Sequence, residues 1–260
     1  MIADDAPFEL RLAQDARDLR GAQRLRYRVF VQELGGDGPM VDHAAGLERD
    51  EFDAVFDHLL LIDPQKAPDD LDHVIGAYRL LPSDRVGAGR FYSEGEYDLS
   101  LLRATGRRLL ELGRSCVHPD HRGGAAMFLL WNALADYVLE RGIEILFGTA
   151  SFHGTDIAAL AQPLAYLHHS HLAPEPLRVT ARADGFQAMD LIPQAAVDRR
   201  VAMAGIPPLI KAYLRLGGFV GQGAWIDRAF NTTDVCLVMD TAAMSARHRE
   251  FYIRKAGHAD

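Results

Sequence analysis

Cysteine is scarce in this chain, which has only Cys116 and Cys236 among 260 residues. Two cysteines cannot build the disulfide framework of a small secreted protein, so we expect a reducing, cytoplasmic setting. A chain of this length buries roughly 70–75% of its unfolded surface, and its folding therefore needs neither disulfides nor a metal.

Long apolar runs are also lacking. No stretch approaches the ~20 apolar residues that a membrane-spanning helix needs. The first residues, 1–5, are acidic and lack a basic region followed by an apolar core, so we expect no secretory signal. Residues 207–216 mix apolar and basic side chains, which is typical either of an interfacial helix or of a helix packed on the core. Peripheral contact with an anionic inner-membrane surface is therefore a further hypothesis.

Positive charge is in deficit, because the formal net charge is −8. This excess of acid excludes a general nucleic-acid binder, whose footprint would be basic. The two signs are nevertheless segregated: residues 11–28 contain six arginines, and residues 37–57 contain seven acids against a single arginine. Neighbouring segments of opposite sign indicate a site that handles both an anion and a cation.

Apolar periodicity and turn-forming residues predict helices and strands in mixed order. The predicted helices cover residues 15–33, 125–141, about 155–169, 207–216 and 243–256. The predicted strands cover residues 59–62, 74–81, 109–117, 143–148, 177–180, 219–226 and 234–239, of which the first two form a hairpin. Such an order is typical of an α+β fold and not of a doubly wound parallel sheet. We expect a core over residues 1–172 and a C-terminal lobe over 173–260 that completes the site.

Residues 117–126 carry the first chemical signal, Val-His-Pro-Asp-His-Arg-Gly-Gly-Ala-Ala, between a predicted strand and a predicted helix. Glycine lets a ligand approach the backbone closely, and unpaired N–H groups at a helix N-terminus favour an anion. A plain strand–helix connection explains two glycines equally well. Neither the Walker A loop nor the dinucleotide fingerprint is present.

This loop resembles the pyrophosphate or pantetheine loop of the GCN5-related N-acetyltransferase (GNAT) superfamily, Gln/Arg-x-x-Gly-x-Gly/Ala, with His121 in place of the usual Gln or Arg. The resemblance covers roughly residues 20–165 and implies a mixed, mostly antiparallel sheet flanked by helices. It also implies that the loop holds a phosphopantetheine arm. The residues assigned to that role are Val117, Arg122, Gly123, Gly124, Ala125 and Ala126.

Four further segments resemble the acyl-homoserine-lactone synthases, a branch of the same superfamily that uses acyl carrier protein (ACP) thioesters. They are Arg26-x-x-x-Phe30, Gly46-x-Glu48-x-Asp50-x-Phe52-Asp53, Arg79-Leu80-Leu81-Pro82 and Glu111-Leu112-Gly113-Arg114. Two features depart from those synthases. Gly36 stands where a tryptophan is expected, and the C-terminal portion is longer.

Both departures fit a sister family, the ornithine–acyl-ACP N-acyltransferases of ornithine-lipid synthesis. Its motifs occur along nearly the whole chain, at residues 25–31, 53–59, 111–117, 151–154, 207–217 and 231–235. The resemblance implies transfer of a (3-hydroxy)acyl chain from ACP to the α-amine of L-ornithine, giving lyso-ornithine lipid, with no permanently bound cofactor. Three alternatives stay open: the same reaction on glutamine, acyl-homoserine-lactone synthesis, and a non-catalytic acyl-ACP-binding module.

Amide formation from a thioester needs a proton acceptor, and a carboxylate can serve as one. An alkyl amine has a pKa of about 10 and must lose a proton before or while it attacks a thioester, and a nearby carboxylate can accept that proton. Glu111 lies on the strand that leads into the loop and is the predicted base, with a structural salt bridge to Arg114 as the alternative. Glu48, Asp50 and Asp53 are predicted to hold an ammonium group or to support the base. A solvated acidic loop is the ordinary explanation for such a cluster.

Arginine binds carboxylates bidentately, so Arg26, Arg79 and Arg114 are predicted either to clamp a substrate carboxylate or to orient the acids. The resemblance adds Phe30 to the substrate-binding residues. No metal is predicted, because the histidines at 168, 169 and 171 lack Cys or acid partners at ligand spacing. The acidic ACP implied by the resemblance is expected to meet opposite charge on the arginines of residues 11–28 and on Arg199, Arg200, Lys211 and Arg215.

Overall fold

The computed structural model describes residues 8–87, 89–123 and 125–243, and the chain divides into two compact units. Unit 1 consists of Met1–Leu81 and Leu112–Arg141. Unit 2 consists of Pro82–Glu111 and Gly142–Asp260. The predicted division into a core over 1–172 and a lobe over 173–260 stays a prediction, and the boundaries of the two units lie elsewhere along the chain.

Unit 1 is built on strands β1 (Glu9–Leu12), β2 (Asp57–Ile62), β3 (Val74–Pro82) and the last six residues of β5 (Leu109–Val117). They lie in the order β1-β2-β3-β5. β2 and β3 pair antiparallel with Leu60 opposite Ala77, which confirms the predicted hairpin. All residues of β3 are buried. A near-continuous apolar strand of this kind requires cover on both faces of the sheet.

Helix α1 (Ala16–Arg26) covers one face of these strands and continues as a π-helical segment over Tyr27–Glu33. Its apolar side chains Ala22, Leu25 and Val29 belong to the same buried cluster as Leu60 and Ala77. The predicted helix over 15–33 is therefore confirmed, with a change from α to π geometry inside it. Such π segments are uncommon and occur frequently at functional sites.

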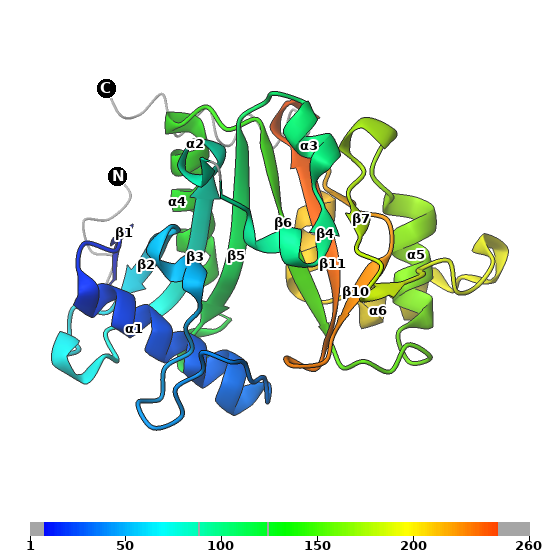
Figure 1. Cartoon of the computed structure of the whole chain (residues 1–260). Helices are drawn as coiled ribbons and strands as arrows, with labels where there is room; N and C mark the ends of the chain where they lie inside the picture. Colours follow the sequence, from blue (N-terminus) through cyan, green and yellow to red (C-terminus); the bar gives the residue numbers. More distant parts are fainter. Residues whose placement is uncertain (1–7, 88, 124, 244–260) are drawn as a thin grey trace. The chain divides into compact units, whose positions relative to one another are not determined.

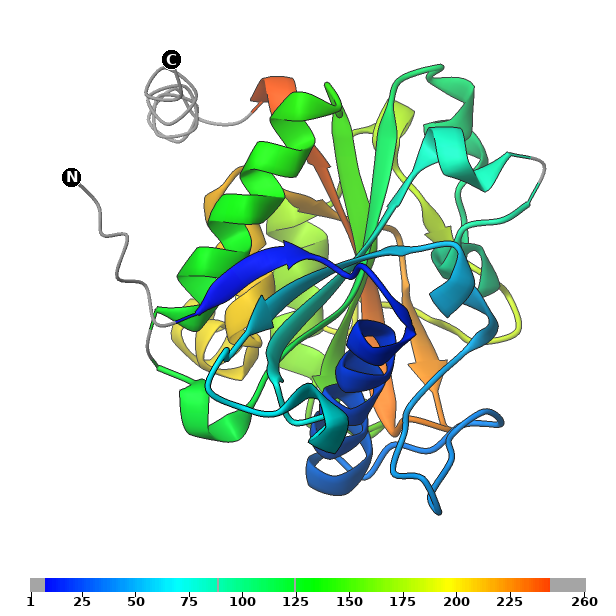
Figure 2. The same cartoon turned by 90° about the vertical axis from the view of Figure 1, so that its left-hand side faces the viewer.

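Helix α4 (Ala126–Glu140) covers the opposite face, as Figures 1 and 2 show. A Cβ atom on Gly76 would lie 3.0 Å from Leu130 of α4 and 3.1 Å from Leu61. Leu60 and Ala77, the sequence neighbours of Leu61 and Gly76, face α1, and successive residues of a strand point to opposite sides of a sheet. The strands of unit 1 thus lie between two helices.

The main-sheet strands of unit 2 follow in the order β5-β6-β11-β10-β8. The first three residues of β5 run parallel to β6 (Ile145–His153), with Glu111 opposite Phe147. β6 then pairs antiparallel with the whole of β11 (Thr232–Asp240), which also pairs with β10 (Ala224–Asp227) and β9 (Phe219–Val220). The short strand β8 (Phe186–Gln187) completes the order, and β4 (Tyr97–Asp98) pairs separately with β7 (Thr180–Ala181). The predicted mixed, mostly antiparallel α+β fold is confirmed.

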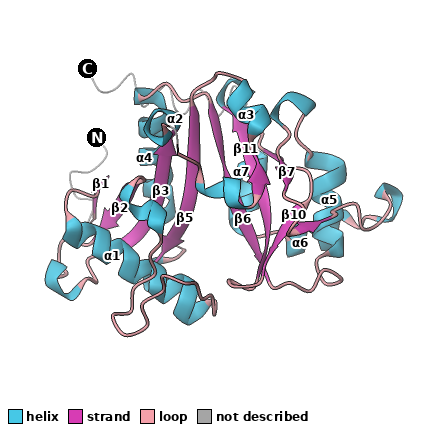
Figure 3. Cartoon of the chain, viewed as in Figure 1, coloured by secondary structure: helices cyan, strands magenta, loops and turns pink. Residues whose placement is uncertain are grey.

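Among the described residues of unit 2, the α-helices are α2 (Ser83–Val86), α3 (Ser100–Ala104), α5 (Ala161–His171), α6 (Arg199–Gly205) and α7 (Pro208–Arg215). Helices α5 and α6 pack together (Figure 3). Among the described residues, no helix combines the length and the apolar character that crossing a bilayer demands.

Most predicted elements are present, and the differences have local causes. The single strand predicted over 219–226 is wrong, because Gly221, Gln222 and Gly223 separate β9 from β10 and Gly223 adopts a φ of +76°. The strand predicted over 143–148 extends to His153, since its whole length pairs with β11. Apart from residue 243, the helix predicted over 243–256 lies outside the described residues.

Candidate active site

Three arginines and three carboxylates meet inside unit 1. They are Arg26 from α1, Arg79 from β3, Arg114 from β5, and Glu48, Asp50 and Asp53 from the segment before β2. We call these six residues the charge network. Its formal charges cancel, and such pairing is the condition under which ionised groups can be buried.

Arg26 is the centre of the charge network and is fully buried. Its Nε donates to Glu48, its Nη1 donates to Asp53 Oδ1 at 2.5 Å, and its Nη2 donates to the Glu48 carbonyl at 2.9 Å. A guanidinium held in this way by two protein carboxylates orients those acids. The geometry thus favours the second of the two roles predicted for Arg26.

Glu48 and Asp53 are held as fixed negative charges. Burial opposes ionisation of Glu48, but the charges of Arg26, Arg114 and Arg79 outweigh it and lower its pKa to about 2. For Asp53, burial is likewise outweighed, chiefly by Arg26, and the pKa of this carboxyl lies well below its usual range. A general base works best with a pKa near the operating pH. These two acids are therefore better suited to electrostatic support, and their predicted catalytic role stays a prediction.

Asp50 and Arg114 are the accessible members of the charge network. Their side chains are 18% and 16% exposed, whereas the other four are at most 6% exposed. Both Asp50 oxygens accept from Arg79 Nη1, at 2.7 and 2.8 Å. Arg114 Nε donates to Glu48 at 3.2 Å, and its Nη2 lies 3.7 Å from Asp50. A negative and a positive group thus stand side by side where a ligand can reach them.

The backbone of Arg114 has a φ of +51°, in the left-handed region. This conformation is uncommon for a residue with a Cβ atom, and such outliers cluster at functional sites. Phe30, the other residue of the predicted Arg-x-x-x-Phe motif, is partly buried and packs on the apolar cluster beneath α1. The motif therefore places one residue in the charge network and one against the core.

The loop between β5 and α4 is anchored at both sides. The His118 N–H donates to the carbonyl of Ile75 at 2.8 Å, and Arg122 Nε donates to the carbonyl of Val117 at 3.1 Å. The Nη1 and Nη2 groups of Arg122 donate to the two Glu33 oxygens, each at 2.6 Å. Gly123 has a φ of +78° and open space where a Cβ would stand.

These anchors leave the start of α4 suited to an anion. No side chain of a described residue caps this helix, and its first turn contains no acid, so its N-terminal amides keep their positive potential. Ala125 and Ala126 stand at that start. Gly124 lies outside the described residues. The predicted binding of a phosphopantetheine arm to this loop stays a prediction.

Glu111, the predicted base, belongs to unit 2 and is 1% exposed. Its Oε2 accepts the N–H of Tyr92 at 2.8 Å, and its Oε1 accepts the N–H of Ser93 at 2.6 Å. Besides its predicted catalytic role, the carboxylate therefore anchors the short 3-10 helix Tyr92–Gly95. Each carboxylate oxygen has a second lone pair, so these two bonds do not prevent it from accepting a proton.

Both cysteines are unsuited to nucleophilic catalysis. Burial raises the pKa of Cys116 to about 12 and that of Cys236 further still. The thiolate, and not the thiol, is the nucleophile. Cys116, which is buried, therefore acts as a small apolar residue.

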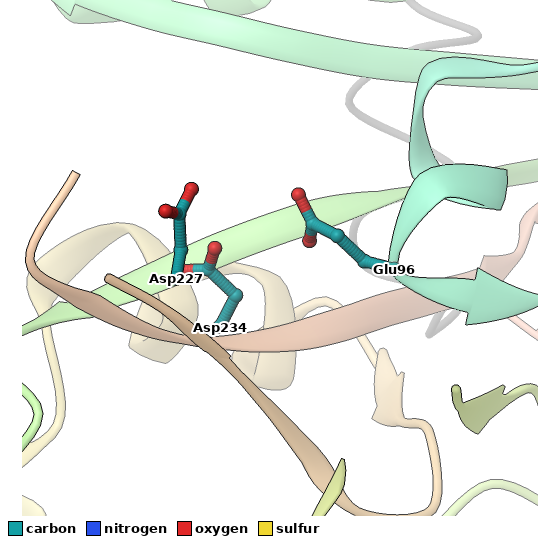
Figure 4. Close-up of side chains that lie close together, drawn as sticks. All are labelled: Glu96, Asp227 and Asp234. Atoms are coloured by element: carbon teal, nitrogen blue, oxygen red, sulfur yellow. The ribbon is translucent and has the colours of Figure 1, made fainter. Parts of the chain in front are cut away.

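Unit 2 also contains a carboxylate cluster that sequence reasoning missed, formed by Glu96, Asp227 and Asp234 (Figure 4). One oxygen of each lies within 4.8 Å of the others. Asp227 and Asp234 come from β10 and β11, and their pairing brings the two acids together. Carboxylate oxygens are the ligands that Mg²⁺ and Ca²⁺ prefer, so a hard cation would find suitable atoms here.

In unit 1, a strand leads through a glycine-containing turn into a helix, and the same unit contains the network of acids and arginines. This arrangement agrees with an N-acyltransferase of the GNAT class, which the comparisons with known proteins show. The family model for the acetyltransferase (GNAT) domain matches residues 25–132. Among solved structures, a CoA-dependent acyl-homoserine lactone synthase is similar over 93% of this chain and 83% of its own, with a TM-score of 0.50 and 16% identity. This similarity shows the shared fold.

Two relatives are named L-ornithine N(α)-acyltransferase. The protein of Rhodobacter capsulatus is 67% identical over 98% of each chain, and that of Brucella abortus is 40% identical over 94% of this chain and 88% of its own. The chain therefore belongs to the L-ornithine N(α)-acyltransferase family, and it is an N-acyltransferase.

Proposed function

We propose that this protein transfers a (3-hydroxy)acyl group from ACP to the α-amine of L-ornithine. In this reaction the amine nitrogen forms a bond to the thioester carbonyl carbon, the carbon–sulfur bond breaks, and the proton that the amine loses to a base ends on the departing thiolate. The products are N(α)-acylornithine and the free thiol of the carrier. The proposal is supported by the names of the relatives, which match this chain over nearly its full length.

The observation that carries the acceptor side of the proposal is the partly exposed pair of Asp50 and Arg114. An amino acid with a basic side chain presents a carboxylate and two amino groups. Arg114 suits the carboxylate, because a guanidinium binds carboxylates in a fixed geometry. Asp50 suits the distal ammonium, which stays protonated near its pKa of about 10 while the α-amine attacks. Glu48, which the sequence also assigned to the ammonium, is buried and paired with Arg26 and Arg114.

Asp50→Asn is expected to raise the Michaelis constant for ornithine with little change in kcat. The variant loses a charge-assisted hydrogen bond worth about 1.5–3 kcal/mol. Steady-state kinetics with ornithine varied checks this. Asp37→Asn, the same exchange at an exposed site of the same segment, is the matched control. An unchanged Michaelis constant for ornithine in Asp50→Asn would exclude the ammonium role. A loss of kcat of about 10²–10⁴-fold, the size expected when a general base is removed, would instead assign Asp50 to proton transfer.

We propose ACP as the donor and its phosphopantetheine arm as the group held by residues 117–126. The support is the family resemblance and the anion-favouring start of α4. CoA carries the same arm and is the alternative donor. Incubating the protein with a 3-hydroxyacyl-ACP, with and without L-ornithine, tests the proposal. Release of the carrier thiol should depend on ornithine, and a donor left intact in its presence would contradict it.

Peripheral contact with an anionic membrane surface and a cytoplasmic location stay predictions. Helix α7, which the sequence singled out as a candidate interfacial helix, buries Ile210 and Tyr213 inside unit 2. These apolar side chains pack on the protein and are not displayed to a bilayer.

A further inference from the structure

Four arginines lie in one row along α1 and the π-helical segment that continues it. They are Arg17, Arg20, Arg24 and Arg28, and we call them the arginine stripe. Residues three and four positions apart share one face of a helix. The opposite face carries Ala22, Leu25 and Val29, which are buried against β2 and β3. The stripe is therefore the outer face of a helix whose inner face is fixed to the core of unit 1.

The arginine stripe carries more charge than its neighbours neutralise. Among the described residues, Arg20 has no ion-pair partner, and Arg24 donates to a neutral carbonyl, that of Gly46, at 3.3 Å. At the two ends, Arg17 pairs with Asp69 at 3.4 Å and Arg28 pairs with Asp72 at 3.2 Å. Ion pairs this exposed contribute little to stability and are readily exchanged. Arg20 and Arg24 therefore leave this row with an excess of positive charge on a chain of net charge −8.

The first half of the arginine stripe borders a depression in the surface. A groove of about 490 Å³ is lined by Asp15, Ala16, Arg17, Arg20, Asp69 and Leu71. Asp15 caps the helix and Asp69 pairs with Arg17, so Arg20 is the guanidinium of the groove that is left for a carboxylate of a partner, beside the apolar side chains of Ala16 and Leu71. A partner could therefore be recognised by the shape of this groove as well as by the charge of the arginine stripe.

The far end of the arginine stripe meets the proposed donor loop within unit 1. Arg28 contacts His118 Nε2, and Glu33, at the end of the π-helical segment, holds Arg122 through two hydrogen bonds of 2.6 Å. At 1.5 Å per residue, Arg17 and Arg28 are separated by about 16 Å along the helix. The positive surface thus leads from the groove to the loop that is proposed to hold the phosphopantetheine arm.

We infer that the arginine stripe is the docking surface for the acidic carrier protein that brings the acyl thioester. This inference rests on the proposed function and goes beyond it by assigning the carrier to one face of one helix. Complementary surface charge raises the rate of encounter and fixes the orientation of the partner. A carrier bound along the stripe would deliver its arm to residues 117–126 without any contact from Arg26, which points inward to the charge network.

The test compares a carrier-bound donor with a carrier-free one. The double variant Arg17→Glu/Arg20→Glu reverses two exposed charges that touch neither the charge network nor the donor loop. We expect its KM for acyl-ACP to rise about tenfold or more with kcat retained, and its kcat/KM with acyl-pantetheine to stay at the wild-type value. The wild-type KM for acyl-ACP should rise with salt above about 0.1 M, where the Debye length is about 10 Å. The matched control is Arg182→Glu, which reverses the charge of an exposed arginine of unit 2. It should behave as the wild type.

Direct binding of the carrier separates failure of this inference from failure of the proposed function. Titrating fluorescent ACP should show tenfold weaker binding to the double variant, whether or not amide is formed. Two results would overturn the docking surface while leaving amide synthesis intact. One is unchanged binding of ACP to the double variant, and the other is a fall in kcat/KM for acyl-pantetheine as large as the fall for acyl-ACP. Weakened binding in Arg199→Glu/Arg200→Glu together with normal binding in the stripe variant would overturn it in favour of α6. A wild-type protein that binds ACP but acylates no amine would instead overturn the proposed function.

Discussion

Glu111→Gln is expected to lower turnover by about 10²–10⁴-fold while leaving binding of acyl-ACP nearly unchanged. Glutamine keeps the size of the side chain but cannot accept the proton that the attacking amine must lose, and removal of a general base typically costs this much in rate. Steady-state turnover and direct carrier binding of the purified variant measure the two quantities separately. Near wild-type turnover would end the assignment of Glu111 as the base.

This variant needs a structural control, because Glu111 accepts the N–H groups of Tyr92 and Ser93. Glutamine has one carbonyl oxygen, so one of these backbone groups loses its acceptor at a cost of about 1–3 kcal/mol. Glu94→Gln disturbs the same turn, since Glu94 accepts the N–H of Phe91 at 2.6 Å, but it is not a proposed base. A similar rate loss in both variants would show that the turn, and not proton transfer, limits the reaction.

Arg26→Ala is expected to destabilise the protein by about 3–5 kcal/mol, the largest stability effect of any substitution in the charge network. The variant leaves Glu48 and Asp53 buried without their main partner, and breaking a buried pair by removing one member has this cost. Denaturant unfolding at neutral pH measures the change. Arg114→Ala, which removes a more exposed member of the same network, should cost less. A change below about 1 kcal/mol in Arg26→Ala would contradict the burial of the pair.

The pH dependence of the free energy of unfolding gives a second test of the same buried pair. In the wild type the pKa of Glu48 is lowered from 4.5 to about 2. Its contribution to stability is therefore fully present above pH 4.5 and is lost as the pH falls toward 2. In Arg26→Ala the isolated acids are stabilised by protonation, so the gap between the two proteins should narrow as the pH falls.

How far the sequence predicts the site is clearest on α1. The apolar positions 22, 25 and 29 give the inner face of the helix directly, and the structure confirms that face. Arg26 is four residues beyond Ala22 and three before Val29, so the same spacing places it toward the interior. That spacing was the available signal that this arginine pairs with buried acids and does not face solvent.

Other features depend on contacts between distant segments and leave no local signal. Glu96 and Asp234 meet through the folding of unit 2, and neither lies in a motif with ligand spacing. The hydrogen bonds from Tyr92 and Ser93 to Glu111 join a loop to a strand across a segment without periodicity. The left-handed backbone of Arg114 is also invisible in the sequence, because residues with a Cβ atom rarely adopt it.

The central claim is that this chain acylates the α-amine of L-ornithine, and one competition measurement tests it most directly. The protein is given a 3-hydroxyacyl-ACP with equal concentrations of L-ornithine, labelled with ¹⁵N on the α-nitrogen, and L-glutamine. Fragmentation of the products by mass spectrometry then identifies the acylated nitrogen. We expect acylornithine with the acyl group on the labelled nitrogen. A product acylated on the distal nitrogen, a predominance of acylglutamine, or the absence of any amide would contradict the claim.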